Sequence, residues 1–293
     1  MTSRPSRRML TLAFAGGDAP APGTGGKVNE WRDDCGEVCA RAYTSKVLHW
    51  IDWPGLGVFA FSAGSYEVRV WPEPNSQHEA IVDTFSRTLE PIILQTLGWQ
   101  VLHAGAAVGP AGVVAFCGRK GSGKSTLAFA MHQAGWRQFA DDALVLRFDQ
   151  DRVMSCPFPF TPRLRPASRA HFAHAHSPSP SSSDSADFPL TAVFLLQQNP
   201  DLTSPRISLM PQARAFSELL AHAHCFDAKD QTQTRRLVDD YLELVARVPV
   251  FALEYQPDLQ QLSQLTRAVV ETVTNLDADG VFSSELQPAD LHP

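Results

Sequence analysis

Nine residues in the middle of the chain have the types and spacing of a site that holds phosphate groups. The segment Gly118-Arg-Lys-Gly-Ser-Gly-Lys-Ser-Thr126 fits the pattern G-x-x-x-x-G-K-S/T. Glycines let a loop curl so that successive backbone N–H groups face an anion, and the dipole of a following helix adds positive potential there. In such a loop Lys124 reaches the β- and γ-phosphates, the Ser125 hydroxyl binds Mg²⁺, and Thr126 supports the start of the helix. The alternative is a glycine-rich turn without a ligand.

The pattern therefore predicts ATP and Mg²⁺ as cofactors. The candidate nucleotide-binding residues are Gly118, Arg119, Lys120, Gly121, Ser122, Gly123, Lys124, Ser125 and Thr126. The flanking residues agree with this, because Val113-Val-Ala-Phe116 is typical of a short buried parallel strand. Residues 127–134 are typical of a helix that ends at Gly135.

A pair of carboxylates follows after one helix and one short strand. The strand predicted at Arg137-Gln-Phe-Ala140 ends in Asp141-Asp142. Phosphoryl transfer needs charge neutralisation and a carboxylate near the nucleophile, and two adjacent carboxylates beside Mg²⁺ can divide these roles. The pair comes too early for a transport ATPase, and the Asn-Lys-x-Asp motif of GTPases is missing. The alternative is that the pair caps a turn between two strands.

With these residues in place, the chain resembles the HPr kinase/phosphorylase family and the HprK-related kinases, whose phosphate-loop core is shared with phosphoenolpyruvate carboxykinase. The resemblance is carried by Leu102-His103-Ala104-Gly105-Ala106, by Gly118 to Thr126 and by Gly135-Trp-Arg-Gln-Phe-Ala-Asp-Asp142. It is specific from Val101 to Leu146 and looser to about residue 273. It implies an α/β fold with a P-loop nucleotide-binding core and a small N-terminal β-rich subregion. It also implies an ATP-dependent phosphotransferase that acts on a hydroxyl, often that of a protein serine.

The resemblance also implies roles for individual residues. One of Asp141 and Asp142 would be the general base toward the acceptor hydroxyl, and the pair would hold Mg²⁺ together with Ser125. His103 matches a histidine near the family's catalytic site, where it would bond a catalytic aspartate or a phosphate; a satisfied core histidine is the alternative. The candidate catalytic residues are thus Asp141, Asp142, His103 and Lys124, and the choice of base between the aspartates stays open.

Other residues depart from the family or add to it. No glutamate lies between Glu90 and Glu218, so the later family signature with its metal-binding glutamate has no counterpart, and neither the phosphorylase reaction nor HPr as substrate is predicted. In the Pro-rich segment that follows the aspartates, Arg163 and Arg165 either bring bidentate donors to phosphate or are solvated. His171, His174 and His176 are interpreted as solvated loop residues, because no carboxylate or cysteine accompanies them at helical spacing.

The composition of the chain limits which classes of partner and which cellular compartment we expect. The formal net charge of −6 and the lack of a basic stripe with interleaved aromatics argue against nucleic acid. No apolar run reaches the length of a membrane span. Five cysteines without the paired spacings of zinc or redox motifs favour a reduced cytoplasm. Ser6-Arg-Arg-Met-Leu10 resembles a twin-arginine export signal only faintly, since the apolar segment after it is short.

Along the chain, residues 1–40 predict a disordered lead-in, and residues 41–98 predict a small β-rich region followed by a helix over 79–97 with a kink at Pro91. Residues 99–276 predict the kinase-like domain, with a low-complexity insertion at 167–188 and a loose tail at 277–293. The leading hypothesis is a cytoplasmic HprK-like kinase whose unidentified acceptor is a protein, peptide or small molecule. A nucleotide-binding regulatory module and a carboxykinase-like enzyme on a small acid are the alternatives, and the resemblance allows a homo-oligomer.

Overall fold

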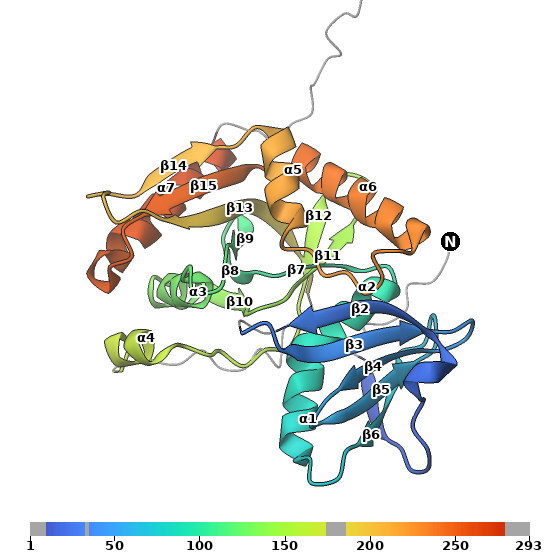
Figure 1. Ribbon diagram of the computed structural model, residues 1–293. Helices are drawn as coiled ribbons and strands as arrows, with labels where there is room; N and C mark the ends of the chain where they lie inside the picture. Colours follow the sequence, from blue (N-terminus) through green and yellow to red (C-terminus); the bar gives the residue numbers. More distant parts are fainter. Residues whose placement is uncertain (1–9, 33–34, 174–185, 279–293) are drawn as a thin grey trace, which may run out of the picture.

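The protein has two sheets, one of six strands and one of nine, that lie next to each other (Figure 1). The computed structural model describes residues 10–32, 35–173 and 186–278. The smaller sheet comes from the first quarter of the chain, and the larger sheet carries helices on both faces. The fold is therefore mixed α/β, as expected. Within the described ranges, no helix is both long enough and apolar enough to cross a bilayer.

The smaller sheet has the strand order β1-β6-β5-β4-β3-β2. Its strands are β1 (Thr11–Phe14), β2 (Gly26–Arg32), β3 (Val38–Thr44), β4 (His49–Trp53), β5 (Gly57–Phe61) and β6 (Glu67–Pro72). Neighbours are antiparallel except β1, which lies parallel to β6. The antiparallel sheet predicted from the short apolar runs between residues 47 and 70 is thus present as β4 to β6.

Residues 10–32 differ from the predicted disordered lead-in, because they form β1, the short 3-10 helix η1 (Pro22–Thr24) and β2. Both strands are sheet edges with few fully buried side chains, so their sequence lacks the alternation of a strand with one buried face. β1 pairs with β6, which lies outside the lead-in, and β2 pairs with β3 (Val38–Thr44), which begins inside it and continues beyond residue 40. Residues 1–9 lie outside the described part of the chain.

The predicted helix over 79–97 is one helical segment in three parts, α1 (His78–Thr84), η2 (Phe85–Leu89) and α2 (Glu90–Thr96). The middle part is π-helical. Pro91 lacks an N–H and its ring crowds the carbonyl four residues earlier, so the wider π turn takes the place of the kink that the proline predicts. The segment buries Ile81, Phe85 and Leu89 against the smaller sheet. This turn also carries Arg87, which reaches the candidate site described below.

The larger sheet runs β10-β8-β9-β13-β12-β11-β7, with β15 beside β13 and β14 beside β15. Its strands are β7 (Gln100–Leu102), β8 (Gly105–Gly109), β9 (Gly112–Cys117), β10 (Arg137–Ala140), β11 (Leu144–Phe148), β12 (Val153–Cys156), β13 (Phe188–Gln198), β14 (Arg206–Leu209) and β15 (Val250–Tyr255). β9, β13 and β15 are mutually parallel, and β8 is antiparallel to β9. The strand predicted at 113–116 is therefore parallel on one side only.

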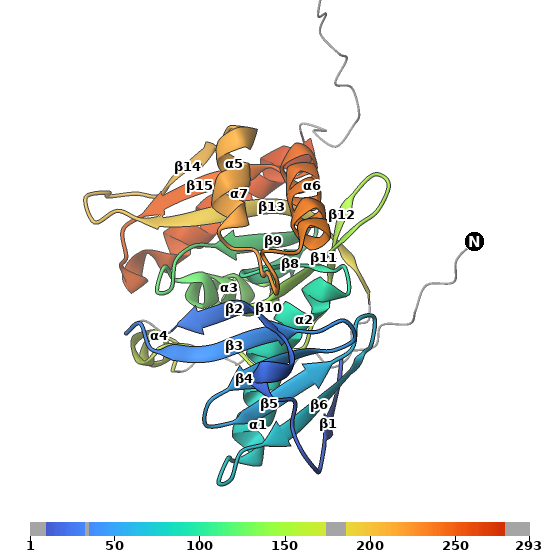
Figure 2. The ribbon, with the colours of Figure 1, turned by 45° about the vertical axis from the view of Figure 1, so that its right-hand side comes forward.

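Helices cover the parallel strands from both sides (Figure 2). One face holds α3 (Lys124–Gln133) and α7 (Leu262–Ala278), and the other holds α5 (Gln212–Leu220) and α6 (Gln231–Arg247). The short elements are α4 (Pro166–His171) and η3 (Leu259–Gln261). The predicted insertion at 167–188 thus begins inside α4 and ends at β13, with residues 174–185 outside the described part. The predicted loose tail starts within the last turn of α7, and residues 279–293 lie outside the described part.

Candidate functional site

The glycine-rich loop leaves the end of β9 and enters α3. Gly118, Gly121 and Gly123 have φ of 151°, 88° and 89°, in the region where a side chain is strained. A Cβ on Gly118 would also lie 2.6 Å from Ser122 Oγ. The loop can therefore take this path only because these positions are glycines.

Lys124, the first residue of α3, is folded into the loop. Its side chain is buried, and Nζ donates to the carbonyl oxygens of Gly118 at 2.9 Å and Arg119 at 3.4 Å. Burial lowers the pKa of Lys124, while the neighbouring Asp142 and Asp141 act in the opposite direction. Burial also raises the pKa of the Cys117 thiol to about 12, so this cysteine is a neutral core group. The loop thus encloses one ammonium group.

Two side chains from neighbouring strands hold the loop from the opposite side. Tyr255, at the end of β15, donates its hydroxyl hydrogen bond to Ser122 O. Gln198, at the end of β13, donates from Nε2 to Gly121 O at 3.1 Å. The loop therefore stands beyond the carboxyl ends of the parallel strands β9, β13 and β15, which is where open α/β sheets bind ligands.

The two carboxylates lie in the turn between β10 and β11 and face different neighbours. Asp141 is buried; its carboxylate hydrogen bonds the Ser125 side chain and accepts from the Arg163 backbone N–H at 3.1 Å. Burial raises the pKa of Asp141, and these hydrogen bonds lower it. Asp141 Oδ1 is buried without a hydrogen-bond partner among the described residues. An orphaned carboxylate oxygen beside the Ser125 hydroxyl is a donor set that fits Mg²⁺.

Asp142 has φ of 69°, a strained value for a residue with a side chain. Its Oδ2 accepts from Arg87 Nη2 at 2.5 Å. The other terminal nitrogen of Arg87, Nη1, is buried without a partner within the described ranges. The π turn of the N-terminal helical segment therefore contributes a cation to the site. Sequence reasoning missed Arg87, because nothing in its local pattern points to a carboxylate 55 residues away.

His103 follows β7 and hydrogen bonds the backbone of Asp142. Burial lowers the pKa of His103, and the Lys124 charge lowers it further. Its ring lies 6.2 Å from that of His224, at an interplanar angle of 76°. The structure thus places His103 beside the backbone of Asp142 and adds a second histidine.

The loop after α5 places His224 there. It crosses β7, where His103 N donates to His222 O at 2.8 Å and His224 N donates to Val101 O at 3.2 Å. Burial lowers the pKa of His224 to about 4, so its imidazole is neutral. Its Nε2 is buried with no partner in the described part of the chain. In the sequence, His224 is marked only by the short His-Ala-His run at 222–224, which indicates no particular chemistry.

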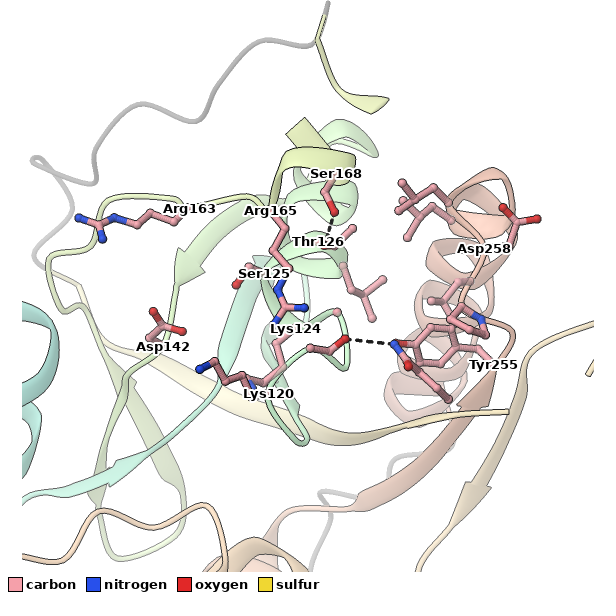
Figure 3. Close-up of a pocket in the computed structure, with 18 of the residues that line it drawn as sticks. Lys120, Lys124, Ser125, Thr126, Asp142, Arg163, Arg165, Ser168, Tyr255 and Asp258 are labelled. Atoms are coloured by element: carbon pink, nitrogen blue, oxygen red, sulfur yellow. Dashed lines mark hydrogen bonds between the residues drawn. The ribbon is translucent and has the colours of Figure 1, made fainter. Parts of the chain in front are cut away.

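A cavity of about 540 Å³ is lined by residues of the glycine-rich loop, by Asp142 and by the two histidines. Figure 3 shows Lys120, Lys124 and Arg165 at its centre, with Asp142 on one side and Tyr255 on the other. A Cβ on Gly121 would meet the Arg165 guanidinium at 3.1 Å, so this side chain lies directly against the loop. The cavity is therefore basic in the middle, carries Asp142 at one end and has mainly apolar side chains, together with Gln256, Asp258 and Gln261, at the other.

The other residues singled out in the sequence lie partly at the loop and partly away from it. Thr126 shares a hydrogen bond of 2.9 Å with Ser168 of α4, which ties the start of α3 to that helix. Arg163 does not point its guanidinium at the loop but bonds Asp83 of α1 at 2.5 Å. His171 packs edge-on against Phe172, whereas His174 and His176 lie outside the described residues. No group of three or more His, Cys, Asp or Glu side chains that could hold a metal ion occurs among the described residues.

Comparison with known proteins gave similarities among solved structures only. No protein-family model matches the chain, and no curated protein matches it. Among solved structures, the chain is similar to the Hpr(Ser) kinase/phosphatase from Coxiella burnetii, with 12% sequence identity and a TM-score of 0.35. The match covers 62% of this chain and 99% of that one. At this level the similarity carries no part of the functional argument, which rests on the residues of the site.

Proposed function

We propose that the protein is an ATP-dependent phosphotransferase that moves the γ-phosphoryl group of Mg·ATP to a hydroxyl group. The observation that carries the proposal is the glycine-rich loop with Lys124 and Ser125 at its end, which opens into the same cavity as Asp142. Left-handed glycines ahead of a helix present N–H groups to an anion. Lys120 and Arg165 beside them add the charge that three phosphates require. The motifs that resemble the HPr kinase/phosphorylase family agree with this function.

The two aspartates suit different parts of the reaction. Asp141, bonded to Ser125 and with one free oxygen, fits the Mg²⁺ side of the site, where the metal would neutralise charge on the phosphates. Asp142 lines the cavity and fits the acceptor side. In the reaction, the acceptor oxygen attacks the γ-phosphorus, the bond to the β-phosphate oxygen breaks and ADP leaves. The hydroxyl proton passes to the Asp142 carboxylate.

Arg87 and the two histidines would position Asp142 and the acceptor. The ion pair with Arg87 fixes the direction of the Asp142 carboxylate, while the hydrogen bond from His103 holds the strained backbone at that residue. Arg87 Nη1 and His224 Nε2 are buried without a partner among the described residues, and both residues line the cavity. Buried polar atoms are rarely left without partners, so their presence at one end of one cavity supports a polar acceptor there.

The test is transfer from γ-labelled ATP with Mg²⁺, with a cell extract as the source of acceptors. Wild type is compared with Asp142→Asn, Lys124→Ala and, as a matched control on the surface, Asp201→Asn. We expect a labelled product from wild type and the control only, with ATP binding kept in Asp142→Asn and weakened in Lys124→Ala. Unchanged ATP affinity in Lys124→Ala would contradict the nucleotide site. Tight ATP binding without any labelled product would favour a regulatory module that binds ATP.

A further inference from the structure

The end of the cavity opposite Asp142 is chemically different from the rest. Its wall runs from the end of β15, through η3, to the first turns of α7. This stretch presents the apolar residues Tyr255, Pro257, Leu259, Leu262 and Leu265 and the polar residues Gln256, Asp258 and Gln261. Leu127 of α3 also lines the cavity. We call the part lined by the six apolar residues the apolar slot. It differs from the opposite end, which carries Arg87, Asp142 and two histidines.

The slot is a built part of the fold rather than a gap between mobile side chains. Leu262 and Leu265 are 9% and 3% exposed and belong to the core between α3, α7 and the sheet. Asp258 caps η3 by accepting from Gln260 N at 2.9 Å. Gln261 donates to the Gln256 side chain at 2.5 Å across the same turn. The backbone that carries the slot is therefore held by its own hydrogen bonds.

The slot is also joined to the glycine-rich loop. Tyr255 forms part of its wall and at the same time donates to Ser122 O in the loop. A molecule that fills the slot therefore lies next to anything that the loop holds. Its walls are mostly aliphatic and aromatic carbon, which favours a flat apolar ring over a charged group.

We propose that the apolar slot binds the nucleobase of the nucleotide whose phosphates lie at the glycine-rich loop. This inference rests on the proposed function. Asp142 and the acceptor lie at one end of the cavity, so the γ-phosphate faces that end and the α-phosphate, ribose and base extend away from it. The slot lies in that direction, and the ring is held there mainly by apolar contact.

The test separates the contribution of the base from that of the phosphates. ATP and inorganic tripolyphosphate, each with Mg²⁺, are titrated into wild type by calorimetry. Both carry three linked phosphates, but only ATP carries a base. Burial of a ring against apolar walls is expected to make ATP bind at least about tenfold more tightly than tripolyphosphate. Equal affinities of the two ligands would overturn the proposal.

A variant then locates the base. Leu259 is half-buried on η3, so Leu259→Asp places a charge in the slot with little disturbance of the core. We expect Leu259→Asp to lose the preference for ATP and to keep the affinity for tripolyphosphate. Leu209→Asp is the matched control, because Leu209 is 66% exposed on β14, away from the cavity. Unchanged ATP affinity in Leu259→Asp would overturn the proposal.

The proposed function can fail independently in the same experiment. Lys124→Ala tests the phosphate site, and tripolyphosphate affinity that survives this change would show that the loop does not hold the phosphates. If Leu259→Asp unfolds, Leu262→Ala serves as the second variant, and it should reduce affinity for ATP but not for tripolyphosphate. A parallel loss of both ligands in a folded slot variant would overturn the base site and leave the loop as the phosphate site.

Discussion

Replacement of Glu90 by glutamine should stabilise the protein at alkaline pH and leave its stability almost unchanged in acid. Glu90 is only 5% exposed at the start of α2, and its Oε1 accepts a hydrogen bond from Leu10 N at 2.9 Å. Burial raises the pKa of Glu90 from 4.5 to about 7, against the smaller lowering effect of that hydrogen bond. The ionised carboxylate is therefore disfavoured in the folded protein.

The sign and size follow from proton linkage. Between pH 4.5 and about 7 the folded protein holds the Glu90 proton more tightly than the unfolded chain does, so the free energy of unfolding falls as the pH rises through this window. At ~1.4 kcal/mol per pH unit, the loss amounts to ~3 kcal/mol above the folded pKa. Glutamine keeps an oxygen that accepts from Leu10 N and carries no charge. The free energy of unfolding of Glu90→Gln therefore does not show this fall in the pH window.

Urea unfolding at pH 5 and pH 8 measures the effect. We expect Glu90→Gln to exceed wild type by ~3 kcal/mol at pH 8 and by much less at pH 5. Glu79→Gln is the matched control, because Glu79 is exposed in the first turn of α1. A difference between Glu90→Gln and wild type that does not change with pH would refute the reasoning.

Three further predictions concern the site. Because burial raises the pKa of Cys117 to about 12, native protein at pH 8 should leave this thiol unmodified by iodoacetamide, which mass spectrometry of the digested protein can check. Because burial lowers the pKa of His224 to about 4, its ring resonances should not titrate between pH 6 and 8 in NMR spectra; a midpoint in that range would contradict its burial. Gly123→Ala forces a side chain to φ of 89° and places its Cβ 3.0 Å from the Tyr255 hydroxyl, so it should lower the free energy of unfolding by about 1–2 kcal/mol in urea titrations.

The parts of the site that the sequence predicts are those built from neighbouring residues. The pattern from Val113 to Ala134 predicts a strand, a glycine-rich loop and a helix, and the structure has β9, the loop and α3 at these positions within a few residues. A strand and the helix that follows it are local, so composition and periodicity suffice to place them. The turn that holds Asp141 and Asp142 is predicted for the same reason.

The parts that the sequence does not predict depend on distant partners. β1 and β2 are edge strands without alternation, and β8 and β12 are short strands whose existence depends on β9, β10, β11 and β13. Arg87 and His224 reach Asp142 and His103 from segments far along the chain. A tertiary contact of this kind leaves no periodic signal in one sequence, and only the fold reveals it.

The parallel pairing of β1 with β6 has a consequence for synthesis of the protein. Thr11 lies opposite Glu67, so the first strand leaves the ribosome 56 residues before its partner. At a translation rate of about 5–20 residues per second, β6 is synthesised roughly 3–11 seconds after β1. During that interval β1 has no strand to pair with. A chain arrested before residue 67 lacks β6, so β1 cannot join the smaller sheet.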